Sequence, residues 1–96
     1  MITSKQRSFL RHMANTMQPI FQIGKGGIEE AFLKQVDEAL EAREIIKITA
    51  LESSGLTARE ASDIICEELG CDGIQAIGRR FVVYRQSKKK PVIEIP

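Results

Sequence analysis

The spacing of apolar residues changes repeatedly along this chain, and that alternation is the feature that most limits its fold. Three segments carry apolar residues at the spacing of an amphipathic helix, at 4–18, 28–42 and 57–69. Four short runs rich in β-branched and aromatic residues lie between and after them, at 20–23, 45–51, 74–77 and 81–86. The predicted order of elements is therefore α-β-α-β-α-β-β.

Short polar signals indicate where two of these helices begin and where one ends. Thr3 and Gln6 have the spacing of a capping box, and Thr57 and Glu60 repeat it. Gly70 lies where a left-handed helix cap is expected. We also expect Pro19 to end the first helix.

Strands that alternate with helices predict parallel strands joined by right-handed crossovers. The gap Gly78–Arg80 has the length of a hairpin turn, which adds one antiparallel strand. We therefore expect an α/β two-layer sandwich, with the helices on one face of a four-stranded mixed sheet. The 96 residues allow a single domain, 1–96, in which 87–96 form a basic tail and Val92–Ile95 could add a short edge strand. A chain this short has no room for the deep cavity of a large enzyme.

The formal net charge of +1 hides a strong segregation of charge along the chain. Residues 1–28 carry four bases and no acid, residues 29–72 carry twelve acids and four bases, and residues 73–96 carry six bases and one acid. The three segments therefore carry net charges of +4, −8 and +5, which add to the total of +1. Such asymmetry indicates a face that binds a polyanion, although acidic helices with solvated surfaces would produce the same arithmetic.

The expected topology gathers several bases at one edge of the sheet. The carboxyl ends of the first three strands should share that edge, which puts Lys25 near Arg79 and Arg80. A tight turn at Gln18-Pro19 would return the start of the first helix to the same edge. Lys5, Arg7 and Arg11 would then join this basic rim.

The glycine-rich segment Gly24-Lys25-Gly26-Gly27 lies between the first strand and the second helix. Glycines at its first and fourth positions can adopt backbone angles closed to other residues, so main-chain N–H groups can approach phosphates at a helix start. KH domains use a G-x-x-G loop of this kind on single-stranded RNA. The segment lacks the spacing of a P-loop or of a dinucleotide fingerprint, so we expect no nucleotide cofactor.

Several segments of the chain, in order, resemble the YhbY group of stand-alone CRM domains (chloroplast RNA splicing and ribosome maturation). The similar segments are Lys5–Arg11, Pro19–Ile28, Glu44–Ile48, Ile77–Arg79, Val83–Arg85 and the ending Pro91–Pro96. The resemblance implies a fold similar to the C-terminal domain of translation initiation factor three. It also implies an RNA-binding loop and, in bacteria, association with precursors of the large ribosomal subunit.

Carried over by position, Gly24, Gly26, Gly27 and Lys25 match the RNA contact of that group. Its basic flank is matched by Lys5, Arg7, Arg11 and Arg79. Three positions depart from the group's pattern: Gly26 where Asn is common, Glu29 where Ser or Thr usually caps the helix, and Arg43 where His is frequent.

The remaining polar candidates indicate no catalytic or metal site. His12 is the only histidine and lies on the polar side of the first helix, where it is a surface residue or an RNA contact. Cys66 and Cys71 are five apart and have no partners with zinc-site spacing, so we expect buried, reduced thiols. Lys88–Lys90 should be a solvated end of the fold, but could hold a second phosphate tract.

These observations favour a non-enzymatic RNA-binding protein that assists assembly of the large ribosomal subunit. Its partner would be ribosomal RNA, bound by shape and phosphate more than by sequence. We expect a cytoplasmic monomer with no cofactor and no membrane segment. The alternative is a protein-protein adaptor on ribosomal particles that uses the acidic second and third helices.

Overall fold

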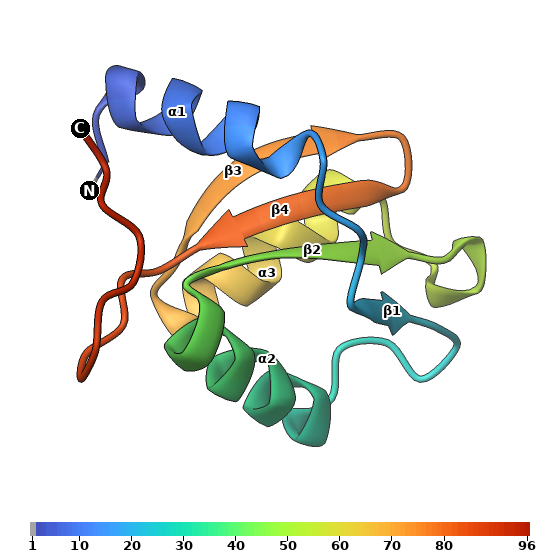
Figure 1. The fold of residues 1–96 in the computed structure, drawn as a ribbon. Coiled ribbons are helices and arrows are strands. Elements are labelled where there is room, and N and C mark those ends of the chain that lie inside the picture. The colour runs from blue at the N-terminus through green and yellow to red at the C-terminus, as the bar shows by residue number, and fades with distance from the viewer. Residues whose placement is uncertain (1) are drawn as a thin grey trace.

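The structure is a computed structural model and describes residues 2–96 (Figure 1). Its elements follow the predicted order: α1 (Ser4–Ala14), β1 (Phe21–Ile23), α2 (Glu30–Arg43), β2 (Ile45–Ala50), the short 3-10 helix η1 (Glu52–Ser54), α3 (Ala58–Leu69), β3 (Asp72–Ile77) and β4 (Arg80–Tyr84). Both capping boxes form, and Gly70 adopts the left-handed cap at φ 65°. Within residues 2–96, no helix has the length and apolar character needed to cross a membrane.

The four strands form one mixed sheet in the order β1-β2-β4-β3. β1 and β2 are parallel, whereas β4 is antiparallel to both β2 and β3. β3 consequently runs in the same direction as β1 and β2. The carboxyl ends of these three strands share one edge, which confirms that the glycine-rich segment and the β3–β4 turn lie at the same end of the sheet (Figure 1).

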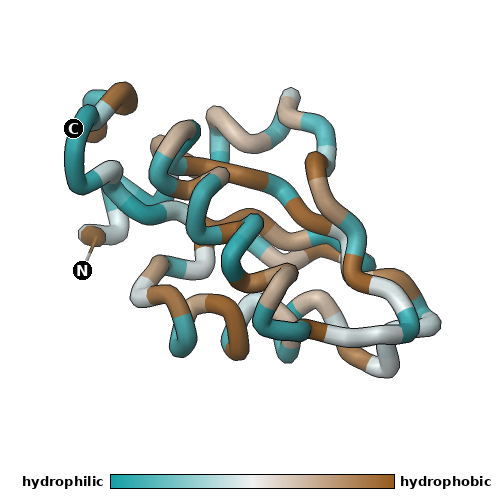
Figure 2. The backbone as a smooth tube through the Cα atoms, turned by 90° about the horizontal axis from the view of Figure 1, so that it is seen from below, coloured by the Kyte–Doolittle hydropathy of each residue, from teal (hydrophilic) through white to brown (hydrophobic). Residues whose placement is uncertain are grey.

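The sheet carries apolar side chains on both of its faces. One face packs against α2 and α3 through a core that includes Ile46, Ile48 and Phe81. The other face packs against α1 through a second core that includes Leu10, Val82 and Tyr84. Figure 2 shows these hydrophobic stretches running through the middle of the molecule.

The α/β class and the mixed four-stranded sheet are confirmed, but the expectation that all helices cover one face is wrong for α1. Together with the sheet, α2 and α3 form the expected two layers, while α1 lies on the opposite face (Figure 1). Consecutive apolar residues in β2 and β4, such as Phe81 and Val82, point to opposite faces of a strand. Both faces therefore need a cover, and α1 provides the second one.

The direction of α1 also differs from the expectation. The helix ends at Ala14 rather than near Pro19; a turn at residues 15–16 and a segment without regular structure at 17–20 then cross the sheet to β1. α1 therefore runs in the same general direction as β2, and its first turns lie at the amino end of β3 (Figure 1). Arg7 reaches that end directly, because its Nη1 donates a hydrogen bond to the carbonyl of Gly73.

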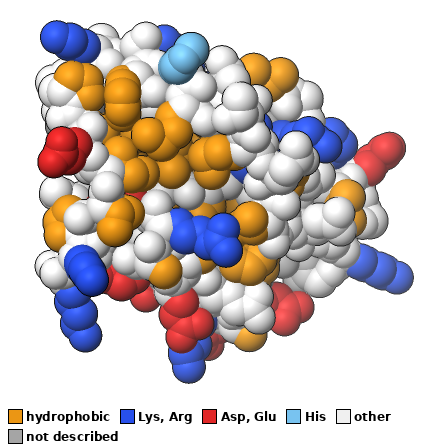
Figure 3. Space-filling model, in the orientation of Figure 1, with side chains coloured by type: hydrophobic (Ala, Val, Ile, Leu, Met, Phe, Trp, Pro, Cys, Tyr) orange, Lys and Arg blue, Asp and Glu red, His pale blue; other side chains and the backbone are white. Residues whose placement is uncertain are grey.

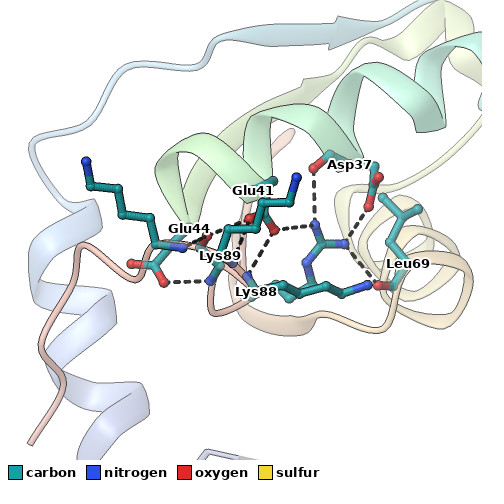
Figure 4. Close-up of polar contacts among 9 residues, drawn as sticks. Asp37, Glu41, Glu44, Leu69, Lys88 and Lys89 are labelled. Atoms are coloured by element: carbon teal, nitrogen blue, oxygen red, sulfur yellow. Dashed lines mark hydrogen bonds and ion pairs between the residues drawn. The ribbon is translucent and has the colours of Figure 1, made fainter.

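Two carboxylates anchor the C-terminal tail to the end of α2 (Figure 4). Glu44 is fully buried and accepts hydrogen bonds from the N–H groups of Ser87 at 2.7 Å, Val92 at 2.7 Å and Ile93 at 2.6 Å. Burial pushes the pKa of Glu44 upward, but the three N–H donors outweigh burial and leave the pKa below its usual value. Among residues 86–96 no strand forms, so the tail is held by these carboxylates and not by a sheet edge.

Glu41 extends the same anchor one turn earlier on α2. Its carboxylate accepts hydrogen bonds from the Ser87 hydroxyl at 2.7 Å and from the backbone N–H groups of Lys88 and Lys89 at 3.1 Å. The Ser87 hydroxyl contributes most to lowering the pKa of Glu41 from 4.5 to about 2. Arg85, which directly follows β4, donates to Asp37 Oδ1 at 2.6 Å and so ties the end of β4 to α2.

Candidate nucleic-acid interface

The glycine-rich segment forms a tight turn directly after β1. The N–H of Gly27 donates to the carbonyl of Gly24 at 2.9 Å, which leaves Lys25 and Gly26 exposed at the tip. Gly27 has φ +71°, the left-handed conformation that favours glycine. Gly24 does not have a positive φ, so the expectation of a special backbone angle holds only for the fourth glycine of the segment.

Space around the two outer glycines is open. A Cβ added at Gly24 or at Gly27 would meet no heavy atom within 4 Å. In the unbound protein, neither packing nor backbone conformation therefore requires glycine at position 24. Its missing side chain leaves the main chain bare toward solvent, where a phosphate could approach the turn closely.

Glu29 places a negative charge against this turn. It is the N-cap residue of α2, but its side chain makes no capping hydrogen bond. Its Oε1 instead lies against Gly26: a Cβ added at Gly26 would be only 2.9 Å from that oxygen. The carboxylate thus stands between the turn and the start of α2, where the helix dipole attracts anions.

Arg79 and Arg80 lie at the same edge but differ in what they contact. Arg79 Nε donates to the carbonyl of Ala50 at 2.6 Å, and its Nη2 donates to the carbonyl of Leu56 at 2.5 Å. Arg79 therefore braces the connection between β2 and α3. Arg80 is exposed and lines two shallow hollows, of about 530 and 210 Å³, on the α1 side of the sheet.

A row of one residue from each strand, three of them polar, crosses the sheet next to this edge. Gln22 pairs with Thr49, Thr49 with Arg80, and Arg80 with Ile77. The residues that follow Gln22, Thr49 and Arg80 in their strands are Ile23, Ala50 and Phe81, and all three belong to the core under α2 and α3. Because successive side chains of a strand point to opposite faces, the row lies on the face that α1 covers. Ile77 is 66% exposed on this face. Lys47 lies on the same face, two residues before Thr49 in β2, and lines a hollow with Arg80 and Ile77.

Acidic side chains are rare around this row. The two hollows lined by Arg80 contain no Asp or Glu, whereas Lys47 and Arg80 contribute positive charge. Figure 3 shows this side of the molecule, with Lys and Arg in blue and the visible acidic side chains mostly toward its margins. Glu30, Asp37 and Glu68 instead line a hollow between α2 and α3.

The structure brings together only part of the predicted basic rim. The turn Gly24–Gly27, Arg79 and Arg80 share the carboxyl edge of the sheet. Lys5 and Arg7 lie at the other end, because α1 crosses the second face instead of turning back at Pro19. Arg11 is exposed on α1, one helical turn before Asn15, which lines a hollow with Arg80.

Thr49 and Lys47 belong to this candidate site and were missed by reasoning from the sequence, as was Gln22 in β1. The available signal was the alternation within 45–51, where Lys47 and Thr49 interrupt an otherwise apolar strand. Reading that alternation as a second exposed face would have identified them. Which of the two faces stays open depends on α1, whose position the alternation does not indicate.

Known proteins are similar in sequence to this chain along all or most of its length. The chain is 40% identical over 96 residues to "Probable RNA-binding protein YqeI" of Bacillus subtilis, and the alignment covers 100% of both. It is 28% identical over 91 residues to "RNA-binding protein" of Haemophilus influenzae, covering 95% of this chain and 92% of that protein.

One solved structure agrees with the fold described above. The solution structure of the hypothetical protein SAV1595 from Staphylococcus aureus superimposes with a TM-score of 0.78 at 40% identity, and all of both chains is covered. The model of the CRS1 / YhbY (CRM) domain family matches residues 2–85. By sequence and by fold, the chain therefore belongs to the CRS1/YhbY (CRM) domain family.

Proposed function

We propose that this protein binds RNA at the carboxyl edge of its sheet, and that its partner is ribosomal RNA in precursors of the large subunit. Binding rather than catalysis is its role, and it acts in the cytoplasm as a ribosome assembly factor. The observation that carries the proposal is the exposed turn Gly24–Gly27, which presents Lys25 and bare main chain at the same edge of the sheet as Arg80. The resemblance of the chain to the YhbY group supports the ribosomal partner.

The arrangement suits phosphate contacts better than the reading of bases. Lys25 supplies a mobile charge at the tip of the turn, and the open space at Gly24 lets a backbone phosphate approach the main chain. Arg80 adds a planar guanidinium, which can bind phosphate or stack on an unpaired base. Arg79 contributes by fixing the edge, since two backbone carbonyls hold its guanidinium.

The variant Lys25→Glu tests the turn as the site. We expect weaker binding to purified large-subunit ribosomal RNA in filter-binding measurements at several salt concentrations. The slope of log K against log salt should fall by roughly 0.7–0.9 for each phosphate that the variant no longer neutralises. The matched control is Arg43→Glu, which makes the same charge change on an exposed residue at the far end of α2.

Equal affinity and equal slope for Lys25→Glu and the unmodified chain would exclude the turn as the site. An equal loss in Arg43→Glu would show that only net charge matters. Circular dichroism of each variant confirms that the fold is kept. Sedimentation of the tagged chain with large-subunit precursors then tests the partner separately from the site.

A second candidate function is a protein-protein adaptor that docks through α2 and α3. A hollow of about 870 Å³ between these helices is lined by Leu33 and Leu69 and by three acidic and three basic side chains, which favours a partly apolar partner of mixed charge. Association with ribosomal particles that survives RNase treatment would support this function. Loss of association after RNase treatment would favour direct RNA binding.

A further inference from the structure

Two thiols meet at the junction between α3 and β3. Cys66 lies in the last turn of α3 and Cys71 directly precedes β3; the Cys71 thiol donates to Cys66 Sγ, with the two sulfurs 3.5 Å apart. The backbone N–H of Cys71 also donates to the carbonyl of Cys66 at 3.3 Å. We propose that this pair is a peroxide-reactive site, in which Cys66 attacks the peroxide and Cys71 closes an intramolecular disulfide.

The geometry brings the pair within reach of a disulfide. A disulfide needs its sulfurs about 2.05 Å apart, so the two Sγ atoms must approach by about 1.5 Å. The left-handed cap at Gly70 turns the chain back on α3 and holds both residues at one place. Both cysteines are partly buried, which leaves them accessible to a molecule as small as hydrogen peroxide.

Cys66 is the sulfur that can meet the oxidant. It lines a hollow of about 430 Å³ together with Arg7, Arg59 and Asp63, so a small oxidant can reach its sulfur from this hollow. Gly73 keeps the sulfur approachable, because an added Cβ there would lie 3.9 Å from Cys66 Sγ and 3.0 Å from Ser62 Oγ. Cys71 does not line this hollow.

Hydrogen bonding assigns the same roles. The thiol of Cys71 donates to Cys66 and lowers the pKa of Cys66, and Ser62 adds to the lowering; together they outweigh burial and the negative charges of Asp72 and Asp63, which raise it. The same hydrogen bond, together with burial, raises the pKa of Cys71. Cys66 is thus the nucleophile, and Cys71 keeps its proton until the second step.

One molecule of hydrogen peroxide oxidises one pair of thiols. The Cys66 thiolate attacks one peroxide oxygen, the O–O bond breaks, and hydroxide leaves, which produces a sulfenic acid on Cys66. Cys71 loses its proton, attacks the Cys66 sulfur and displaces the hydroxyl as water. Two thiols are oxidised to one disulfide, and hydrogen peroxide is reduced to two molecules of water.

The experiment treats the full reduced chain, free of RNA, with hydrogen peroxide and follows its intact mass after alkylation with iodoacetamide. We expect a mass loss of about 2 Da and the disappearance of both alkylatable thiols, both reversed by dithiothreitol. Cys71→Ser should stop at a sulfenic acid, with a gain of about 16 Da that dimedone traps. Cys66→Ser should react at least about tenfold more slowly than the unmodified chain.

Two outcomes overturn the proposal: both thiols of the unmodified chain stay alkylatable after peroxide, or the disulfide forms only between chains. Equal rates in the two serine variants would overturn the assignment of roles. A measurement on the unmodified chain avoids dependence on the folding of the variants. Brief labelling with limiting iodoacetamide, followed by peptide mapping, should modify Cys66 well before Cys71, and the reverse order contradicts the proposal.

Discussion

At the scale of single residues, the four positions of the glycine turn have different physical roles. Gly27 is needed for its φ of +71°, whereas Gly24 has an ordinary backbone and open space around it. Lys25 supplies the charge, and Gly26 leaves room for the Glu29 carboxylate. The motif therefore divides into a part required for folding and a part that is free to serve a ligand.

Gly24→Ala separates these two parts. We expect it to fold with unchanged stability, because the new Cβ meets nothing within 4 Å, but to weaken RNA binding by blocking close approach of a phosphate. Gly27→Ala should instead lose about 1 kcal/mol of unfolding free energy through its strained φ. Urea unfolding and filter binding on both variants make the comparison, and unchanged RNA affinity in Gly24→Ala would count against main-chain contact at the turn.

Glu29 is expected to reduce the affinity of the turn for phosphate. Glu29→Thr removes a negative charge beside Gly26 and introduces a residue that can cap α2. RNA affinity should rise severalfold at low salt, and the free energy of unfolding should rise by about 0.5–1 kcal/mol. Glu38→Gln, exposed on the same helix, is the control for loss of one negative charge. Equal gains in both variants would mean that Glu29 acts only through net charge.

At the scale of elements, the C-terminal tail depends on side chains from a helix rather than on strand pairing. Glu41 and Glu44 together accept hydrogen bonds from five backbone N–H groups and one hydroxyl of the tail. Glu44 adopts a φ of 68°, unusual for a residue other than glycine, and the surrounding contacts keep it there. The tail should therefore detach when these carboxylates lose their charge.

Acid should weaken this anchor in a defined pH range. Because the pKa of Glu41 is about 2 in the folded chain and 4.5 ordinarily, its contribution is complete above about pH 5 and is lost as the pH falls toward 2. Glu41→Gln should be less stable at pH 7 and should lose less stability on acidification than the unmodified chain. Thermal unfolding between pH 7 and pH 3 measures both, and parallel pH curves for the two proteins would contradict the prediction.

At the scale of the whole molecule, the bases of the two basic end segments, apart from those that follow β4, such as Lys88–Lys90 in the tail, form two separate regions. One is the carboxyl edge with Lys25 and Arg80, and the other is the start of α1 with Lys5 and Arg7. The acidic helices α2 and α3 occupy the opposite face of the sheet from α1. An RNA bound to the carboxyl edge need not contact the start of α1.

The variants Arg80→Glu and Lys5→Glu each replace a positive charge with a negative one, one variant in each region. Arg80→Glu should weaken RNA binding by about tenfold or more, because a hydrogen bond to a charged group contributes about 1.5–3 kcal/mol. Lys5→Glu, exposed at the far end of the sheet, should change affinity much less. Binding titrations at a single moderate salt concentration suffice, and equal losses would mean that the RNA spans both regions.

Much of this architecture could be predicted from local sequence patterns. The capping boxes at Thr3 and Thr57, the left-handed cap at Gly70 and the shared edge of the parallel strands all follow from short-range signals, and all are present. The ends of elements were less predictable, as α1 stops at Ala14 although nothing before Pro19 forbids a longer helix. Helix ends depend on what the helix packs against as well as on its own residues.

The sequence by itself determined the order of elements, the glycine turn and the family, because each depends on residues close together in the chain or on their pattern along it. Only the tertiary structure decided that α1 covers the second face and that Glu44 holds the tail. The physical reason is that the position of α1 depends on which apolar sheet face lacks a cover. That requirement outweighed the local turn expected at Pro19 and moved Lys5 and Arg7 away from the glycine turn.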